Sequence, residues 1–195
     1  MKRVEGSVVK RWVAVLAAVM VVCIVGTAFA LVRPPLRAAI MLRAAGYEHH
    51  FAGRKGEAVL AIVSSTSGTA SKDGEAMNQV LRDMLAQTKV AGRRVRVVTI
   101  AHANAEATNS SLQDAKAELV YVAQGLEALL PHVPKQVDGI RRIVFCADGA
   151  QVGSGCTLGV ELAQEKPRIV IDLEQTNSVG LRFDLRLLKI ARIVR

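Results

Sequence analysis

An uncharged stretch of 21 residues, from position 12 to position 32, constrains this chain more than any other feature. Four basic residues precede it within the first eleven positions, and Pro34 and Pro35 follow it. About 20 apolar residues are enough for a helix to cross a bilayer, and a basic segment followed by an apolar run is also the pattern of an export signal. Residues 1–30 are therefore expected to be a signal peptide or an N-terminal signal anchor, separate from the folded domain.

The sequence leaves cleavage and retention of this segment open. Ala28-Phe29-Ala30 places small residues where a signal peptidase requires them, which favours cleavage. The length of the uncharged run favours an anchor that stays in the membrane. In both cases the basic residues remain in the cytoplasm, so the chain after Arg33 is expected to be exported.

Separating this segment changes the meaning of the net charge. The whole chain carries 26 Lys and Arg against 17 Asp and Glu, a net charge of +9, but only +6 belongs to residues 31–195. Aromatic residues make up 4% of the chain, and its basic residues are scattered along the sequence. Nucleic-acid-binding proteins concentrate basic side chains, so no nucleic-acid partner is expected.

Short apolar runs alternate with segments of helical periodicity after residue 36. Strands are expected at residues 57–64, 94–100, 118–123 and 142–147, and helices at 36–51, 75–89 and from 125 to about 130. This alternation favours an α/β fold, with a mostly parallel sheet flanked by helices.

The pattern changes toward the carboxyl end. Residues 158–162 and 168–173 are two apolar runs separated by a short polar segment, which predicts an antiparallel hairpin at the edge of the sheet. A last helix is expected at residues 181–194. Residues 36–195 are thus expected to form a single domain.

Cys146 and Cys156 are the two cysteines of the exported part. In an oxidising compartment an even pair favours a disulfide, which would close a loop with nine residues between the cysteines. Two free thiols are the alternative. A metal site would need further ligands that the neighbouring sequence does not supply.

A polar loop over residues 65–74 connects a predicted strand to a predicted helix. Its first part is a candidate ligand loop, since backbone N–H groups at such a junction can hold an anion. An ordinary polar connection is the alternative, because the Lys-Ser/Thr ending of a phosphate-binding P-loop is missing. The candidate residues are Ser65, Thr66, Ser67, Gly68 and Thr69.

Catalytic chemistry has no recognisable constellation in this sequence. His49 and His50 are neighbours and would point apart on a helix, so they cannot easily share a metal. His102 and His132 have no sequence partner, and Ser110-Ser111 lacks a nucleophile elbow. The chain is therefore expected not to be an enzyme, with no catalytic residue, metal or cofactor.

Arg182, Arg186 and Lys189 would form a narrow stripe on the predicted last helix. Such a stripe is either a solvated strip on a packed helix or a docking site for an acidic partner surface.

Three segments at the carboxyl end form a distinctive pattern: RIVIDLE at residues 168–174, GLR at 180–182 and LLKIARIVR at 187–195. This pattern resembles the YfiR family of periplasmic proteins. Family members commonly have a strand ending in INLE, an AGL turn and LLxLARIV there. Upstream of these motifs, the AGRRVRVV segment at 91–98 and the predicted strand at 118–123 occur in the same order as in the family.

This sequence departs from the family pattern at several positions. Asp172 replaces the usual Asn, and Phe183-Asp184 replaces a Ser pair. Glu118-Leu119 stands where many members have Cys-His, so one disulfide of some members cannot form here, whereas Cys146 and Cys156 remain available for the other. The opening helix also lacks the family's aromatic-rich form.

The resemblance implies a non-enzymatic periplasmic regulator that binds an inner-membrane diguanylate cyclase and represses cyclic di-GMP synthesis. It also implies an outer-membrane lipoprotein that sequesters the regulator. A sensor kinase as the membrane partner and a homodimer are left open. The main rival is a periplasmic module that senses a small ligand without a cyclase partner; a secreted hydrolase is least favoured.

Overall fold

The computed structural model describes residues 32–194, so the predicted signal peptide or anchor at residues 1–30 lies outside the described residues. Among residues 32–194, no helix combines the length and apolarity needed to span a membrane.

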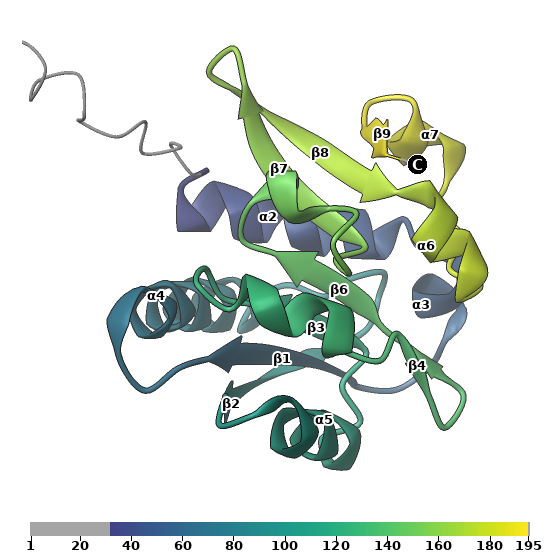
Figure 1. Ribbon diagram of the computed structural model, residues 1–195. Helices are drawn as coiled ribbons and strands as arrows, with labels where there is room; N and C mark the ends of the chain where they lie inside the picture. Colours follow the sequence, from purple (N-terminus) through teal and green to yellow (C-terminus); the bar gives the residue numbers. More distant parts are fainter. Residues whose placement is uncertain (1–31, 195) are drawn as a thin grey trace, which may run out of the picture. The chain divides into compact units, whose positions relative to one another are not determined.

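A seven-stranded sheet in the order β2-β1-β3-β6-β7-β8-β9 organises this part of the chain (Figure 1). Strands β1, β2, β3, β6 and β7 run parallel. Every residue of β1, β3 and β6 is buried, as expected for parallel strands covered on both faces, which read as continuous apolar runs. The first four strands are β1 (Ala58–Ser64), β2 (Val95–Ala101), β3 (Leu119–Val122) and β6 (Ile143–Cys146).

The carboxyl-terminal part of the sheet contains the predicted antiparallel hairpin. Strands β7 (Leu158–Ala163) and β8 (Lys166–Asp172) pair antiparallel, and Figure 1 shows the tip of this hairpin extending away from the other strands. A short strand, β9 (Arg192–Val194), then pairs parallel with β8. The predicted α/β fold class is confirmed, although β9 rather than the hairpin forms the edge.

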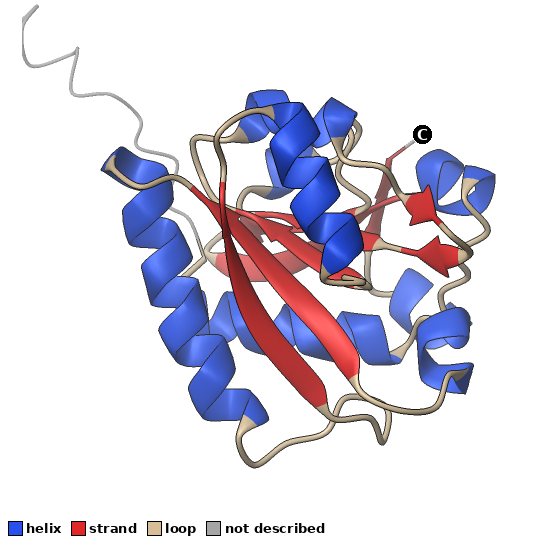
Figure 2. Ribbon diagram, turned by 90° about the horizontal axis from the view of Figure 1, so that it is seen from below, coloured by secondary structure: helices blue, strands red, loops and turns tan. Residues whose placement is uncertain are grey.

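Helices cover both faces of the sheet (Figure 2). On one face α2 and α4 pack on a core that includes Met41, Met77 and Phe145. On the other face α5 and a 3-10 helix, η1, pack on a core that includes Leu112 and Leu130. The helices are α2 (Pro34–Gly46), α3 (His49–Gly53), α4 (Gly68–Leu85), α5 (Ala105–Asp114), η1 (Glu127–His132), η2 (Gly149–Gln151), α6 (Leu173–Ser178) and α7 (Leu185–Leu188). Strands β4 (Gln136–Val137) and β5 (Ile140–Arg141) form a separate small hairpin.

The predicted last helix at residues 181–194 is wrong. Only α7, a helix of four residues, forms there, and the chain then extends into β9. The apolar residues of this segment fit helical spacing, but Ile193 and Val194 align with Ile171 and Asp172 of β8 instead. Pairing with an open sheet edge satisfies backbone groups that a helix would have satisfied internally.

Two further elements differ from the sequence-based expectation. The polar loop after β1 is shorter than residues 65–74, since α4 already begins at Gly68. Helix α5 was not predicted, because its polar sequence buries only Thr108 and Leu112. Its amino end carries a recognisable signal: the side chain of Asn104 accepts a hydrogen bond from the Ala107 N–H at 2.8 Å.

Candidate functional site

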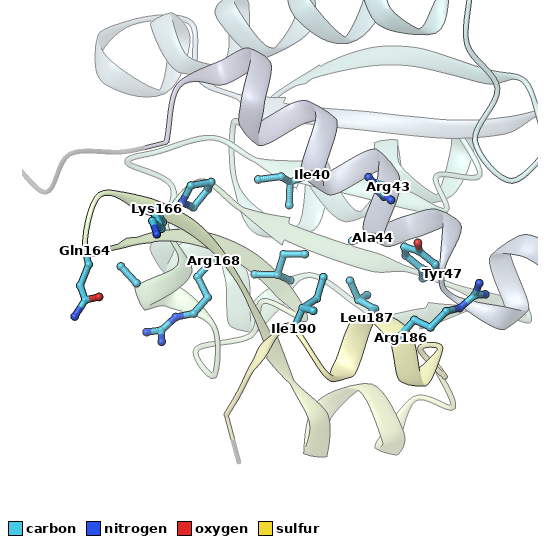
Figure 3. Close-up of a pocket in the computed structure, with 13 residues that line it drawn as sticks. Ile40, Arg43, Ala44, Tyr47, Gln164, Lys166, Arg168, Arg186, Leu187 and Ile190 are labelled. Carbon is cyan, nitrogen blue, oxygen red and sulfur yellow. The ribbon is translucent and has the colours of Figure 1, made fainter.

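A groove of about 660 Å³ lies between α2, the β7–β8 hairpin and the segment around α7. Figure 3 shows that side chains from these three segments, which are far apart in the sequence, converge on it. Its apolar lining includes Ile40, Ala44, Ile169, Leu187 and Ile190, and its basic lining residues are Arg43, Lys166, Arg168 and Arg186. We call this feature the basic groove.

Hydrogen bonds between the end of α2 and the chain before α7 fix the α7 side of the basic groove. The Tyr47 carbonyl accepts a hydrogen bond from the Asp184 N–H at 2.9 Å, and the His49 N–H donates to the Arg182 carbonyl at 2.9 Å. The fully buried Glu48 carboxylate accepts from the Phe51 N–H at 2.6 Å and the Arg182 N–H at 2.9 Å. The chain before α7 is thereby held against the end of α2.

Arg186 is oriented at the mouth of the groove by two neighbours. Its guanidinium donates to both carboxylate oxygens of Asp184, at 3.0 and 2.9 Å, and its Cζ lies 5.4 Å from the centre of the Tyr47 ring. These hydrogen bonds lower the pKa of Asp184 to about 2, so the pair is ionised at neutral pH. Arg186 therefore presents a fixed but partly neutralised charge.

The remaining cations of the groove are less well neutralised. Arg168 shares the Glu161 carboxylate with Arg192, at 2.6 and 2.9 Å. Arg43 and Lys166 form no salt bridge with any residue in the range 32–194. The basic groove consequently has an excess of positive charge, which favours an acidic partner.

Large apolar side chains are exposed beside these cations. Ile190, which lines the groove, is 67% exposed, and Leu185 on α7 is 70% exposed. Ile190 therefore leaves apolar surface in the groove open to a bound molecule, while Leu185 lies outside the groove lining. The combination of apolar lining and basic rim suits a protein segment that carries both apolar and acidic side chains.

The three predicted docking residues do not all lie in the basic groove. Arg186 lines the groove, whereas Arg182 lies in the segment before α7 and Lys189 follows the end of α7. All three are exposed, but they do not form a stripe on one helix because the long helix is absent. Arg43, Lys166 and Arg168 were missed; Lys166 and Arg168 are two residues apart on one strand, a spacing that places both side chains on the same face.

The predicted ligand loop lies at the carboxyl end of β1, away from the basic groove. Ser65, Thr66 and Ser67 precede α4, and Gly68 and Thr69 belong to its first turn. Strand β1 lies between β2 and β3, so the loop is at the point where the strand order reverses, the usual ligand-binding position in open α/β sheets.

Beneath this loop lies a buried polar cluster. Asp73 forms an ion pair with Arg37 and accepts hydrogen bonds from the Tyr121 hydroxyl at 2.6 Å and the Gln124 N–H at 2.9 Å. Burial raises the pKa of Tyr121 well above its ordinary value, so its hydroxyl stays protonated as the donor. The Asp73 charge is therefore neutralised within the protein. Its contacts with Arg37 on α2 and Tyr121 on β3 hold these two elements against α4.

Cys146 and Cys156 are joined by a disulfide, with their Cα atoms 5.8 Å apart. Both are buried in the core beneath α5 and η1. The bond connects the end of β6 to the chain just before β7 and closes the turn that contains η2. Within residues 32–194, His, Cys, Asp and Glu side chains form no group of three that could hold a metal ion.

Comparison with known proteins gives a family and a fold. A family model described as YfiR/HmsC-like matches residues 35–192. A search of curated proteins finds no match.

Two solved structures share the fold at low identity. One is an ABC domain in complex with L-Trp from Streptococcus pneumonia, with 13% identity and a TM-score of 0.56. The other is a conserved domain protein from Vibrio cholerae O1 biovar El Tor, with 10% identity and a TM-score of 0.58. Each alignment covers 83% of this chain, which spans only 60% of the length of either structure.

Proposed function

Because this chain belongs to the YfiR/HmsC-like family, we propose that it is a periplasmic regulator that binds and represses an inner-membrane signalling enzyme of the diguanylate cyclase type. Release of the enzyme would raise cyclic di-GMP. The observation that carries the proposal is the family match, which extends over nearly the whole described domain. The regulator acts by binding and performs no catalysis.

We assign the contact with the membrane enzyme to the basic groove. Arg43 and Lys166, which have no salt bridge within the described chain, would pair with acidic side chains of the enzyme's periplasmic part. Ile190 and Leu185 would bury their exposed apolar surface against it. Apolar burial would supply most of the affinity, and the charges would guide orientation and association.

Export and release complete the proposed cycle. Residues 1–30 would deliver the domain to the periplasm, and an uncleaved anchor would keep it beside its target in the inner membrane. An outer-membrane lipoprotein that sequesters the regulator would compete for the same groove and thereby activate the cyclase.

The test combines a gene deletion with site-specific crosslinking in living cells. Deletion should raise cyclic di-GMP, and a photo-crosslinking residue at position 190 should capture an inner-membrane protein. The same residue at Ser110, an exposed position of α5 on the other face of the sheet, should not capture it. An unchanged cyclic di-GMP level together with no membrane protein captured at position 190 would reject the proposal.

A small-ligand sensor is the second candidate function. It is favoured by the place of the loop containing Ser65, Thr66, Ser67, Gly68 and Thr69 at the reversal of strand order. A rise in melting temperature with a small anionic metabolite, lost in Thr66→Glu, would favour this function. An equal rise in Thr66→Glu would place the ligand elsewhere.

A further inference from the structure

A second concave surface, of about 460 Å³, lies at the amino ends of β1 and β2. The chain segments that enter these two parallel strands form it, and none of its lining residues lines the basic groove. Five of its nine lining residues are basic and one is acidic. The basic residues are Arg54, Lys55, Lys89, Arg93 and Arg94, and we call this surface the amino-edge hollow.

Arg93 provides the rigid frame of the hollow. This buried side chain donates hydrogen bonds to the carbonyls of Phe51 and Gly56, both at 3.2 Å, and stacks 4.6 Å from the centre of the Phe51 ring. It also forms hydrogen bonds of 2.9 and 2.7 Å with the Glu118 carboxylate. One guanidinium thus joins the segment before β1, the turn before β2 and the start of β3.

Two tight turns form the walls of the hollow. Val90 and Arg93 exchange two backbone hydrogen bonds of 3.0 Å across a turn whose central residues, Ala91 and Gly92, have φ angles of +49° and +79°. On the opposite wall Gly56 has a φ of +87°. Since these turns are pinned by Arg93, the exposed side chains beside them extend from a fixed backbone.

The hollow contains more positive charge than its own acids neutralise. Glu118 is the only acidic partner, among the described residues, of both Arg93 at 2.7 Å and Arg54 at 3.4 Å. Glu57 pairs with Arg96 on β2, at 3.5 Å. Lys55, Lys89 and Arg94 are exposed and form no salt bridge within residues 32–194.

The cations without an acidic partner suit an anion that several of them can contact at once. Cations held around a concave surface reinforce one another's field and attract counter-ions. A carboxylate offers two oxygens in one plane, whereas the oxygens of a phosphate group are arranged tetrahedrally around phosphorus, so that several cations can approach them from different directions. Lysine is a common phosphate ligand, and an arginine can bind a phosphate through two hydrogen bonds.

We propose that the amino-edge hollow binds a phosphate group, presented either by a phospholipid headgroup or by a soluble phosphate compound. This site goes beyond the proposed regulatory function and is independent of it. Lys55, Lys89 and Arg94 contact the phosphate oxygens, while Arg93 and Glu118 act as positioning residues that hold the two turns in place.

Two binding measurements on the full chain test this site and distinguish the phosphate sources. Binding of inorganic phosphate is followed by calorimetry, and binding to phosphatidylglycerol vesicles is compared with binding to phosphatidylcholine vesicles. The test variant is Lys55→Glu/Lys89→Glu, which removes two exposed cations without disturbing the Arg93 frame. The control is Lys72→Glu/Lys116→Glu, which makes the same change in net charge at two exposed lysines outside the hollow.

We expect the Lys55→Glu/Lys89→Glu variant to bind about thirtyfold more weakly, since each of the two lost basic residues contributes roughly 1 kcal/mol near an anionic surface and about 1.4 kcal/mol is a factor of ten. The control should retain wild-type binding. A loss confined to phosphatidylglycerol vesicles identifies lipid headgroups as the source, and a loss of inorganic phosphate binding identifies soluble phosphate. Equal losses in both variants, or no binding of either probe by the wild type, would overturn the site. Neither outcome depends on cyclic di-GMP, so the regulatory proposal is tested separately.

Discussion

Asp73 lies where helices α2 and α4 meet strand β3, and its carboxylate is shared by Arg37, Tyr121 and the backbone of Gln124. A buried cation that loses its partner pays the full cost of desolvation, which makes removal of one partner far more harmful than the net contribution of the pair. The position of α2 against α4 and β3 therefore depends on this cluster.

Asp73→Asn should lower the free energy of unfolding by about 3 kcal/mol, because it leaves Arg37 buried without a counter-charge. Urea denaturation would measure the loss. Asp83→Asn, which removes an exposed carboxylate from the same helix, should change stability by no more than about 0.5 kcal/mol. If Asp73→Asn cost as little as its control, the cluster would not stabilise the fold.

Glu161 gives stability a dependence on pH. Burial raises its pKa, but hydrogen bonds from Arg192 and Arg168 outweigh this effect, and the pKa lies below its ordinary value. The ionised carboxylate therefore stabilises the fold above the unfolded-state pKa of about 4.3. This contribution is lost as the pH falls through the lower pKa of the folded state.

Glu161→Gln should accordingly cost about 1 kcal/mol at neutral pH, and progressively less as the pH is lowered below about 4. Urea denaturation at a series of pH values would follow the difference. Glu165→Gln, at an exposed carboxylate in the same hairpin, should cost less than half as much at neutral pH. A cost of Glu161→Gln that stayed constant down to low pH would contradict the role of the ion pair.

The continuous apolar sequences of the central strands made these strands predictable. Strands β1, β3 and β6 are buried at every position, so their sequences are almost entirely apolar. Apolar runs this short are typical of buried strands, because helices are usually longer. The final segment, in contrast, could not be predicted from its own sequence. Its apolar spacing suits a helix, and only the open edge of β8, a tertiary feature, makes residues 192–194 extended.

The turn of the β7–β8 hairpin has a backbone conformation that its two residues disfavour. Gln164 and Glu165 occupy a two-residue turn with φ angles of +50° and +63°, a conformation that disfavours ordinary side chains by about 1 kcal/mol per residue. Asn-Gly is the preferred pair in such turns. Replacing Gln164-Glu165 with Asn-Gly should therefore stabilise the protein by about 0.5–1 kcal/mol in urea denaturation.

Glu165→Ala is the matched control for the turn, because it removes the side chain but keeps a residue that disfavours positive φ. It should bring no gain in stability. If the Asn-Gly variant were no more stable than Glu165→Ala, the turn conformation would not limit the stability of the hairpin.

In the molecule as a whole, the candidate site was harder to predict from the sequence than the fold. Arg43 and Lys166 line one groove but are more than a hundred positions apart in the sequence, so no local pattern could bring them together. The sequence predicts Arg186 as a docking residue on a long last helix; the structure has only the short helix α7 there, and Arg186 lines the groove. The amino-edge hollow could not be predicted from the sequence for the same reason. Some of its cations precede β1 and the others follow α4.

In the proposed function, this protein represses a membrane-bound cyclase by docking through its basic groove. The most direct test of this claim is the cyclic di-GMP level in cells that carry Arg43→Glu/Lys166→Glu in place of the wild type, at equal periplasmic abundance. The level should rise as far as in the deletion strain, while Lys72→Glu/Lys116→Glu, with the same change in net charge, should remain at the wild-type level. A wild-type level in the Arg43→Glu/Lys166→Glu cells would contradict the claim.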